Sequence, residues 1–270
     1  MEEIISSEQN SKIKSLKRLY SKRQRKKKGK FLLEGYRIID EALKSEAVFD
    51  DIYMTADFIN SDQGKSIIEL MQKNNNIQYP IVVQDKLLES IADTASPQGI
   101  IAVVNEDDYT LGEVFKGNKT LLLLDQIQDP GNMGTIIRTA VAAGVGGIIV
   151  LKGSVDIYNL KVLRSTMGAI FNIPLVKNTT LDDFLQSYNN IKHKYQLIST
   201  DLSAEKYYNQ VEYNEPVIIA IGNEANGLRK GIIDQSDLCI KIPVIGDINS
   251  LNAAIAAGII VYKVMEKKWI

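Results

Sequence analysis

Three loops, each following a predicted strand, hold the polar residues of this sequence that are best placed to do chemistry. The loop after the apolar run 120–125 passes through an Asp-Pro-Gly turn to Asn132 and, six residues on, to Arg138. Gly134 and Arg138 are four residues apart, so they share one face of a predicted helix. A bare stretch of backbone beside a guanidinium could accept a phosphate or a sugar. Capping by Asn132 and ordinary exposure of Arg138 would explain the two residues separately, but not their combination with the turn.

The other two loops carry an isolated carboxylate and an isolated amide. Glu224 stands alone between Gly222, which ends a predicted strand, and Gly227, for which we expect a positive φ. Glycine-rich loops are common, so this loop is a weak signal by itself. Ser250 is suited to the N-cap of the last helix, whereas Asn252 falls in its first turn. That helix is apolar on nearly every side and is therefore expected to be buried, so Asn252 needs a polar partner.

A parallel sheet would place these loops together, because ligands bind at the carboxyl ends of strands in open α/β sheets. Apolar runs near 120–125, 147–151, 196–200, 217–222 and 237–244 alternate with helical patterns. The first half alternates in the same way, with strands expected at 31–35, 51–55, 80–84 and 100–104. We therefore expect an α/β protein with a parallel sheet covered on both faces. The polar, glycine-containing residues 106–119 are the best linker candidate, between a first domain over 1–105 and a second over 120–270.

The composition excludes several classes of function. A single cysteine, Cys239, leaves no internal disulfide, and a single histidine, His193, leaves almost nothing for a metal site. No GxxxxGK[ST] phosphate loop is present, and no GxGxxG follows the first strand of the second half. No apolar stretch reaches the length of a membrane span, and the acidic, polar start of the chain is unlike a secretory signal. We expect a cytoplasmic protein with no membrane partner and no metal.

A basic segment near the start indicates a nucleic-acid partner. Eleven lysines and arginines lie between Lys12 and Lys30 with no acidic residue among them, although the whole chain has a net charge of −1. Apolar residues at helical spacing, such as Ile13 and Leu16, would let the segment dock as a helix. A solvated charge run is the alternative. The cations expected to contact RNA phosphates are Lys22, Arg23, Arg25, Lys26, Lys27 and Lys28.

Four segments carry a family resemblance when they are taken in order. NMGTIIRTA, RSTMGAIFNIP, GNEANGL and IPVIGDINSLNAAIA resemble the three motifs of the SpoU/TrmH family, in the SPOUT class of RNA methyltransferases. The resemblance covers residue 120 to the C-terminus closely. The first half resembles, more loosely, the substrate-binding domain of rRNA-modifying members, which is similar to small RNA-binding ribosomal proteins. Thr166 stands where this family usually has serine, a change that keeps the hydroxyl.

The resemblance implies a fold, a cofactor and a site. The fold is a parallel sheet whose C-terminal segment threads into a trefoil knot, in a homodimer, with S-adenosylmethionine as methyl donor and no metal. Arg138 would act as the base for a ribose 2′-hydroxyl, and a side chain at Gly222 would intrude on the cofactor while leaving the fold largely intact. The further polar residues that the resemblance places in the site are Asn132, Glu224, Ser250 and Asn252. The residues whose backbone it places in contact with the cofactor are Gly222, Ile242 and Leu251.

The function implied is methyl transfer to a ribose 2′-hydroxyl of ribosomal RNA. A tRNA 2′-O-ribose methyltransferase is the alternative within the class, and the N-terminal substrate domain favours rRNA. An inactive RNA-binding or ribosome-assembly factor on the same fold is the alternative from another class. The presence of all five polar site residues favours an active enzyme over that alternative.

Overall fold

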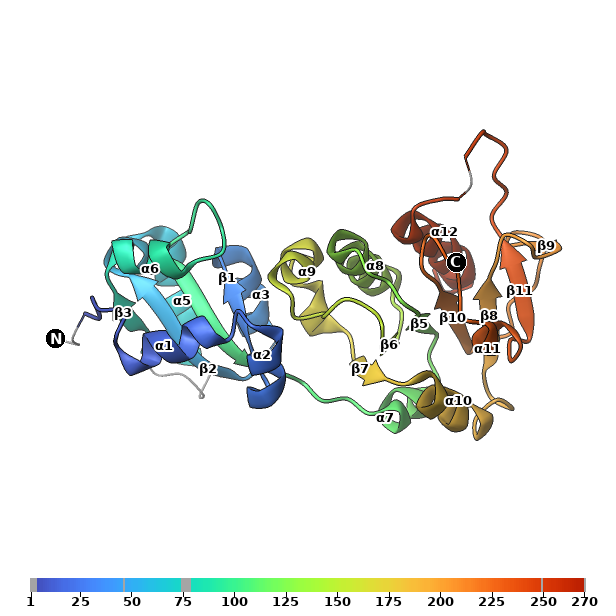
Figure 1. Cartoon of the computed structure of the whole chain (residues 1–270), viewed down its shortest axis with the longest axis horizontal. Coiled ribbons are helices and arrows are strands. Elements are labelled where there is room, and N and C mark those ends of the chain that lie inside the picture. Colours follow the sequence, from blue (N-terminus) through green and yellow to red (C-terminus); the bar gives the residue numbers. More distant parts are fainter. Residues whose placement is uncertain (1–3, 46, 74–78, 249, 270) are drawn as a thin grey trace. The chain divides into compact units, whose positions relative to one another are not determined.

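The computed structural model describes residues 4–45, 47–73, 79–248 and 250–269, and its chain forms two compact units (Figure 1). The first unit comprises Met1–Asp107 with Tyr158–Phe171, and the second comprises Asp108–Ile157 with Asn172–Ile270. Both units combine a β-sheet with helices, which confirms the predicted α/β class. Within the described part of the chain, no helix has the length and apolar character needed to cross a membrane.

The first unit contains a mixed four-stranded sheet in the order β1-β4-β2-β3. The prediction of a parallel sheet is wrong here, because β4 runs antiparallel to both β1 and β2, and only β2 and β3 are parallel. Alternation of strands and helices does not set strand direction, since a helical connection can also join antiparallel strands. All four strands were predicted, and their bounds are β1 Lys30–Glu34, β2 Phe49–Thr55, β3 Ile81–Val83 and β4 Ile100–Asn105.

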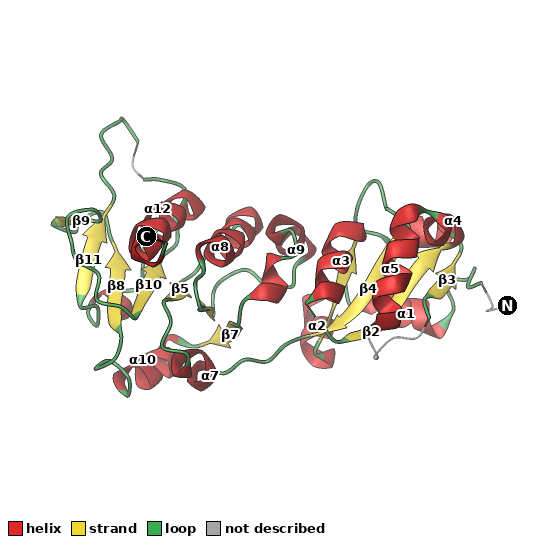
Figure 2. Ribbon diagram, turned by 180° about the vertical axis from the view of Figure 1, so that it is seen from behind, coloured by secondary structure: helices red, strands yellow, loops and turns green. Residues whose placement is uncertain are grey.

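Helices cover the sheet of the first unit (Figure 2). Helices α1 (Ser11–Arg18) and α6 (Asp85–Ile91) share one apolar cluster with the strands. Helix α3 (Tyr36–Lys44) packs against α5 (Asp62–Lys73) and β1. Since side chains alternate along a strand, β1 can direct Leu32 into the first cluster and its neighbours to the opposite face. The remaining helices of this unit are α2 Lys22–Lys28, α4 Ala56–Asn60 and α9 Leu160–Thr166, and the 3₁₀ turn η1 Ala169–Asn172 ends at the first residue of the next segment of the second unit.

The second unit contains a seven-stranded sheet in the order β7-β6-β5-β10-β8-β11-β9, and every pair of neighbours is parallel. The parallel sheet predicted for this half is therefore confirmed. Strands β7 and β9 were not predicted, because β7 is polar at its end and both residues of β9 are exposed. The bounds are β5 Leu121–Leu124, β6 Gly147–Leu151, β7 Leu175–Thr179, β8 Gln196–Thr200, β9 Lys206–Tyr207, β10 Val217–Ile221 and β11 Leu238–Lys241.

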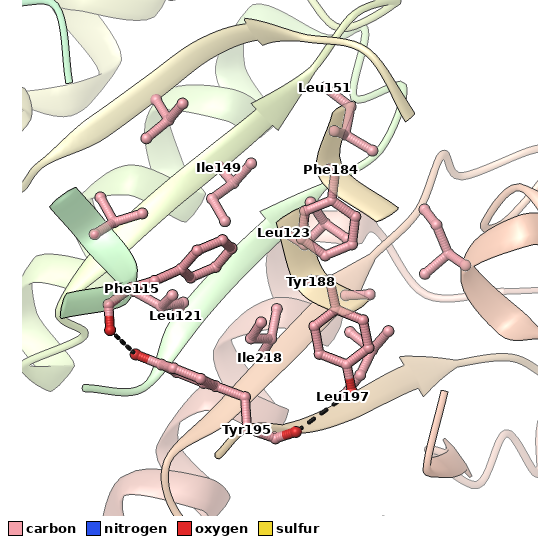
Figure 3. Close-up of a cluster of buried hydrophobic side chains, with 14 of the residues drawn as sticks. Phe115, Leu121, Leu123, Ile149, Leu151, Phe184, Tyr188, Tyr195, Leu197 and Ile218 are labelled. Carbon is pink, nitrogen blue, oxygen red and sulfur yellow. Dashed lines mark hydrogen bonds between the residues drawn. The ribbon is translucent and has the colours of Figure 1, made fainter. Parts of the chain in front are cut away.

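One apolar cluster of the second unit joins the sheet to helices α7 (Leu111–Lys116), α10 (Leu181–Asn189) and α11 (Lys230–Ile233) (Figure 3). Two tyrosines in it are fully covered and bond to backbone. Tyr195 Oη donates to the Phe115 carbonyl at 3.2 Å, and Tyr188 Oη donates to the Tyr195 carbonyl at 3.3 Å. Helices α8 (Pro130–Ala143) and α12 (Ala253–Met265), which is followed by the 3₁₀ turn η2 (Glu266–Lys268), pack against each other, and α12 also contacts β10.

The expected linker over 106–119 differs from what the structure shows there. Helix α7 lies within it and begins with a capping box, in which Thr110 and Glu113 bond to each other's backbone N–H. Val114 and Phe115 are buried in the core of the second unit. A six-residue helix with so few apolar positions has no detectable periodicity, so the sequence pattern resembles a polar connection.

Candidate active site

The N-cap of helix α8 is a residue other than Asn132, so the side chain of Asn132 is not used for capping. The N-cap is Asp129, whose Oδ1 accepts a hydrogen bond from the Asn132 backbone N–H at 2.7 Å. The prediction that Asn132 caps this helix is therefore wrong. Pro130 follows Asp129, and proline is favoured at the first helical position, which fixes the start of the helix three residues earlier. The Asn132 side chain is consequently available for other partners.

Helix α12 also begins at a residue other than the predicted one. Its N-cap is Asn252, whose Oδ1 accepts from the backbone N–H groups of Ala254 at 3.0 Å and Ile255 at 3.3 Å. The prediction of Ser250 as the cap is wrong, because Ser250 lies two residues before it in an exposed loop. The capping bonds use only the oxygen of the Asn252 amide, so its nitrogen remains free to donate elsewhere.

A chain of side-chain hydrogen bonds joins three of the predicted polar residues. Asn252 Nδ2 donates to Asn132 Oδ1 at 2.8 Å, and Asn132 Nδ2 donates to Glu224 Oε1. These residues belong to the loops that follow β5, β10 and β11. Asn132 is the central member, because its amide accepts on one side and donates on the other. The structure therefore brings Asn132, Glu224 and Asn252 together and fixes the orientation of each amide.

A cavity of about 290 Å³ lies at the carboxyl ends of β8, β10 and β11. All three residues expected to contact the cofactor line it, namely Gly222, Ile242 and Leu251, together with Glu224 and Ser250. The rest of its wall combines apolar side chains with polar residues: two at the end of β8, two asparagines of the loop after β10, Asn223 and Asn226, and Lys241 of β11. The apolar lining residues include Ile240, Val244, Ala256 and Ile260, and the polar pair at the end of β8 is Thr200 and Asp201.

Gly222 is required by the loop that borders this cavity. A Cβ on Gly222 would lie 2.4 Å from the Gly227 carbonyl carbon and 2.5 Å from the Leu228 nitrogen. The loop is closed by reciprocal bonds between Asn223 and Gly227, and Gly227 has the predicted positive φ, at 66°. The expectation that a side chain at Gly222 would disturb only the cofactor is therefore wrong, because the loop's own backbone occupies that space.

A buried ion pair that the sequence reasoning missed holds the far end of this loop. Asp125, at the end of β5, is 0% exposed. It accepts hydrogen bonds from the Arg229 backbone N–H at 2.9 Å and from Nε at 2.8 Å, and Arg229 Nη2 lies 2.6 Å from it as an ion-pair contact. The sequence did carry a signal for this ion pair, because Asp125 directly follows a run of four leucines. A carboxylate at the end of such a buried strand requires a partner of opposite charge or a hydrogen-bond donor.

Arg138 lies apart from these groups. It is exposed on α8 and, among the described residues, forms no hydrogen bond or ion pair. It is also absent from the lining of the cavity. The structure thus supplies an unengaged guanidinium on the helix that begins at Asn132, but it does not bring Arg138 into the hydrogen-bonded chain.

The basic segment folds into α1 and α2, in the first unit. Five of the six predicted phosphate contacts are exposed, but Arg25 is only 6% exposed. Its Nη1 donates to the carbonyls of Leu19 at 3.0 Å and Tyr20 at 2.8 Å, which closes the C-terminal end of α1. The expectation for Arg25 therefore disagrees with the structure. Lys28 Nζ donates to Ser15 Oγ at 2.7 Å, so it is partly engaged within the segment.

Two further findings concern the hydroxyl of Thr166 in the second motif and the side chains that could hold a metal ion. Thr166, at the end of α9, is buried and donates its hydroxyl to the Leu163 carbonyl at 2.7 Å, so this hydroxyl serves its own helix. In the described ranges, no group of three or more histidine, cysteine, aspartate or glutamate side chains is arranged to hold a metal ion.

Comparison with known proteins places both halves of the chain. Residues 119–262 match the SpoU rRNA Methylase family, and residues 10–102 match the MRM3-like substrate binding domain. The 23S rRNA (guanosine(2553)-2′-O)-methyltransferase RlmP of Bacillus subtilis is 34% identical over 96% of this chain and 97% of its own length. The crystal structure of an AdoMet-bound rRNA methyltransferase from Sinorhizobium meliloti has a TM-score of 0.86 at 26% identity, covering 98% of each chain. AviRb from Streptomyces viridochromogenes, in complex with AdoMet, has a TM-score of 0.86 at 25% identity, covering 97% of this chain and 99% of its own.

Proposed function

We propose that this chain, which belongs to the SpoU rRNA methylase family, transfers a methyl group from S-adenosylmethionine to a ribose 2′-hydroxyl of ribosomal RNA. The observation that carries the proposal is one cavity at the ends of β8, β10 and β11, whose lining residue Glu224 is hydrogen-bonded to Asn132, which in turn is bonded to Asn252. The similarity to RlmP extends over nearly the whole of both chains, so it includes the substrate-binding half as well as the catalytic half.

The cavity fits the methyl donor in size and chemistry. The apolar part of its wall suits the flat adenine ring, and the carboxylates of Asp201 and Glu224 are polar groups for the rest of the molecule. The closely packed loop at Gly222 forms part of the cradle. When bound, S-adenosylmethionine supplies a methyl group activated by its sulfonium. The attacking oxygen therefore needs orientation and loss of a proton, for which no metal is required.

Orientation of the ribose and removal of its hydroxyl proton are proposed for two different groups, namely the hydrogen-bonded residues around Asn132 and the side chain of Arg138. Asn132, held between Glu224 and Asn252, presents a fixed amide beside the cavity, which suits it to orient the ribose. Arg138 is proposed as the group that takes the hydroxyl proton. A guanidinium normally keeps its own proton, so Arg138 must first release a proton to solvent and then, as the neutral guanidine, take the hydroxyl proton, while a contact with a substrate phosphate holds the ribose beside it. Its exposure, without an internal partner, leaves both edges of the guanidinium available for that contact.

The substrate class can be tested directly. We expect the purified protein, supplied with radiolabelled S-adenosylmethionine, to methylate 23S rRNA transcripts and not bulk tRNA. Mapping of 2′-O-methyl positions in rRNA from cells with and without the protein should then identify the nucleotide. Methylation of tRNA alone would favour the tRNA alternative, and cofactor binding without transfer to either RNA would favour an assembly factor.

A homodimer is proposed from the exposed face of α12. Ile255 is 56% exposed, Tyr262 is 45% exposed and Trp269 is 50% exposed, and Tyr262 packs on Trp269 at 5.0 Å between ring centroids. Ile255 and Tyr262 are seven residues apart and lie on one side of the helix. We expect sedimentation to give a dimer that Tyr262→Asp dissociates. Tyr79→Asp, at a tyrosine of the first unit that is 71% exposed, is the matched control and should leave the dimer intact.

The proposal extends to the division of labour and to location. Residues 1–105 are proposed to bind the RNA and residues 120–270 to carry out the transfer, consistent with the two matched families. The trefoil knot stays a prediction from the family resemblance. A cytoplasmic location is proposed from the rRNA substrate.

A further inference from the structure

Asn223, in the loop after β10, forms hydrogen bonds in two directions through its side-chain amide. Its Oδ1 accepts from the backbone N–H groups of Ala225 at 2.9 Å and Asn226 at 3.1 Å. Its Nδ2 donates to the Gln126 carbonyl at 3.0 Å. An oxygen that accepts twice and a nitrogen that donates once determine which way the amide points. Asn223 thus shapes its own loop with one atom and bonds to the loop after β5 with the other.

Gln126 has a backbone conformation that requires support from its surroundings. Its φ is 57°, in the left-handed region that residues other than glycine rarely adopt. Such a conformation persists where the surrounding structure holds it. Just before it, the Asp125 N–H donates to the Ile221 carbonyl at 2.9 Å, which joins the ends of β5 and β10. The bond from Asn223 extends this connection past the ends of the strands, to the carbonyl of the left-handed residue.

The turn at Gln126 leads directly to the start of α8. Asp129, the N-cap of α8, lies three residues after Gln126, and Asn132 follows in the first turn of the helix. On the other loop, Glu224 is the residue next to Asn223, and it accepts from Asn132 Nδ2. The same two loops are therefore joined twice, once by Asn223 and once by Glu224. If the bond from Asn223 is lost, we expect the bond between Glu224 and Asn132 to lose its alignment.

We infer that Asn223 is a positioning residue of the candidate active site, which keeps the Asn132 amide aligned with Glu224 by holding the turn at Gln126. It acts through these side chains and not by contact with the RNA. The ion pair of Asp125 with Arg229 holds the far end of the same loop, so Asn223 acts at the end that carries Glu224. The inference rests on the proposed function, because methyl transfer is the reaction whose rate it affects.

Asn223→Asp removes the donor and keeps the oxygen that shapes the loop. The new carboxylate would still accept from Ala225 and Asn226, but its second oxygen would face the Gln126 carbonyl, which is also an acceptor. We expect the single-turnover rate of methyl transfer to rRNA to fall by about tenfold or more, since a misplacement of about 1 Å can cost about a hundredfold. S-adenosylmethionine is kept saturating, because Asn223 also lines the cavity proposed for the cofactor. Asn118→Asp, at an exposed asparagine just before β5, makes the same change of charge and should keep the wild-type rate.

Rescue by glycine separates positioning from a general loss of stability. Gln126→Gly keeps the carbonyl and adopts a positive φ without strain, so the turn then depends less on Asn223. We expect Gln126→Gly to restore most of the rate that is lost in Asn223→Asp. Asn118→Gly is the matched control, because Asn118 also has a positive φ, of 46°, but lies at the other end of β5. It should restore none of the lost rate.

The side-chain amide signals of Asn132 report the same effect without catalysis. In ¹H–¹⁵N spectra, with these signals assigned by means of Asn132→Asp, we expect Asn223→Asp to shift them. Addition of Gln126→Gly should return them toward their wild-type position. Asn223→Ser is the second variant if Asn223→Asp does not fold, because a serine hydroxyl can accept from N–H groups of its own loop but is too short to reach Gln126.

Three results would overturn the inference. The first is a folded Asn223→Asp protein with a wild-type rate, or with Asn132 signals that do not shift. The second is a loss of rate that Gln126→Gly does not restore, and the third is a loss that Asn118→Gly restores equally well. Failure of the proposed function is distinguishable, because it would appear as absent methyl transfer to rRNA by the wild-type protein, and the Asn132 signals would then still test the positioning.

Discussion

Replacing Asp125 by alanine should destabilise the second unit and weaken binding of S-adenosylmethionine together. The carboxylate is fully buried and accepts two hydrogen bonds from Arg229, one of them from the backbone, and it also forms an ion pair with Arg229 Nη2. Removing one partner of a buried ion pair costs about 3–5 kcal/mol, because the other charge is left uncompensated. The Arg229 side chain is 30% exposed, so water recovers part of that cost. The lower end of the range, about 3 kcal/mol, is therefore expected.

Calorimetry gives the direct measurement. For a unit of about 150 residues, 1 kcal/mol shifts Tm by roughly 2–4 °C, so Asp125→Ala should lower the Tm of the second unit by about 6–12 °C. Asp108→Ala is the matched control, because Asp108 pairs with Lys177 at 3.3 Å in the same unit but is 93% exposed. An exposed pair contributes about 1 kcal/mol at most.

The expected loss of affinity for S-adenosylmethionine in Asp125→Ala follows from the position of Arg229. Its backbone N–H ends the loop that begins at Gly222 and borders the cavity proposed for the cofactor. Asp125→Ala should therefore raise the Kd for S-adenosylmethionine, measured by calorimetric titration at a temperature where the variant is folded. A Tm decrease no larger than that of Asp108→Ala would refute the stability estimate. A normal Kd would show that the ion pair does not position the loop.

Three further predictions concern the cofactor, the base and the RNA. Gly222→Ala should lower both Tm and S-adenosylmethionine affinity, because its Cβ meets the Gly227 backbone; a folded variant with normal affinity would contradict this. Arg138→Lys and Arg138→Ala should each reduce the single-turnover rate by about 10²-fold or more with near-normal cofactor binding, and a near-wild-type rate for the lysine variant would exclude Arg138 as the base. Alanine at both Lys26 and Lys27 should lower the slope of log affinity against log salt by about 0.7 for each phosphate of single-stranded RNA that is no longer neutralised; alanine at Lys65, a lysine on α5, is the control and should leave the slope unchanged.

The polar residues that the structure joins could be selected from the sequence, but the helix caps beside them could not. Asn132, Glu224 and Asn252 were selected because polar groups in post-strand loops are candidates for chemistry, and the structure joins them. Asparagine and serine are both good N-caps, however, and sequence alone does not say which of two nearby candidates begins the helix. At α8 the cap is Asp129, and this difference has a functional consequence, because it releases the Asn132 amide.

The direction of the strands was predictable in one unit and not in the other. Runs such as the four leucines of β5 are apolar on both faces, which is typical of a parallel strand covered by helices on both sides. In the first unit, β1 and β4 are equally apolar yet antiparallel. Burial on both faces is thus compatible with either direction.

The bond between Asp125 and Arg229 was also missed, since it joins residues more than one hundred positions apart.

Strand order explains why three distant segments form one site. Strand β10 is inserted directly beside β5, so the loops that carry Asn132 and Glu224 leave neighbouring strands at the same edge of the sheet. The segment after β11 starts two strands away from β10, yet Asn252 still reaches Asn132 because α12 packs against α8 and both helices begin at that edge. The amide of Asn132 is therefore hydrogen-bonded to a residue of each of the other two segments, Glu224 after β10 and Asn252 after β11. We therefore expect a displacement of the segment before α12 to reach Glu224, which lines the cavity proposed for the cofactor, through the hydrogen bonds of Asn252 and Asn132.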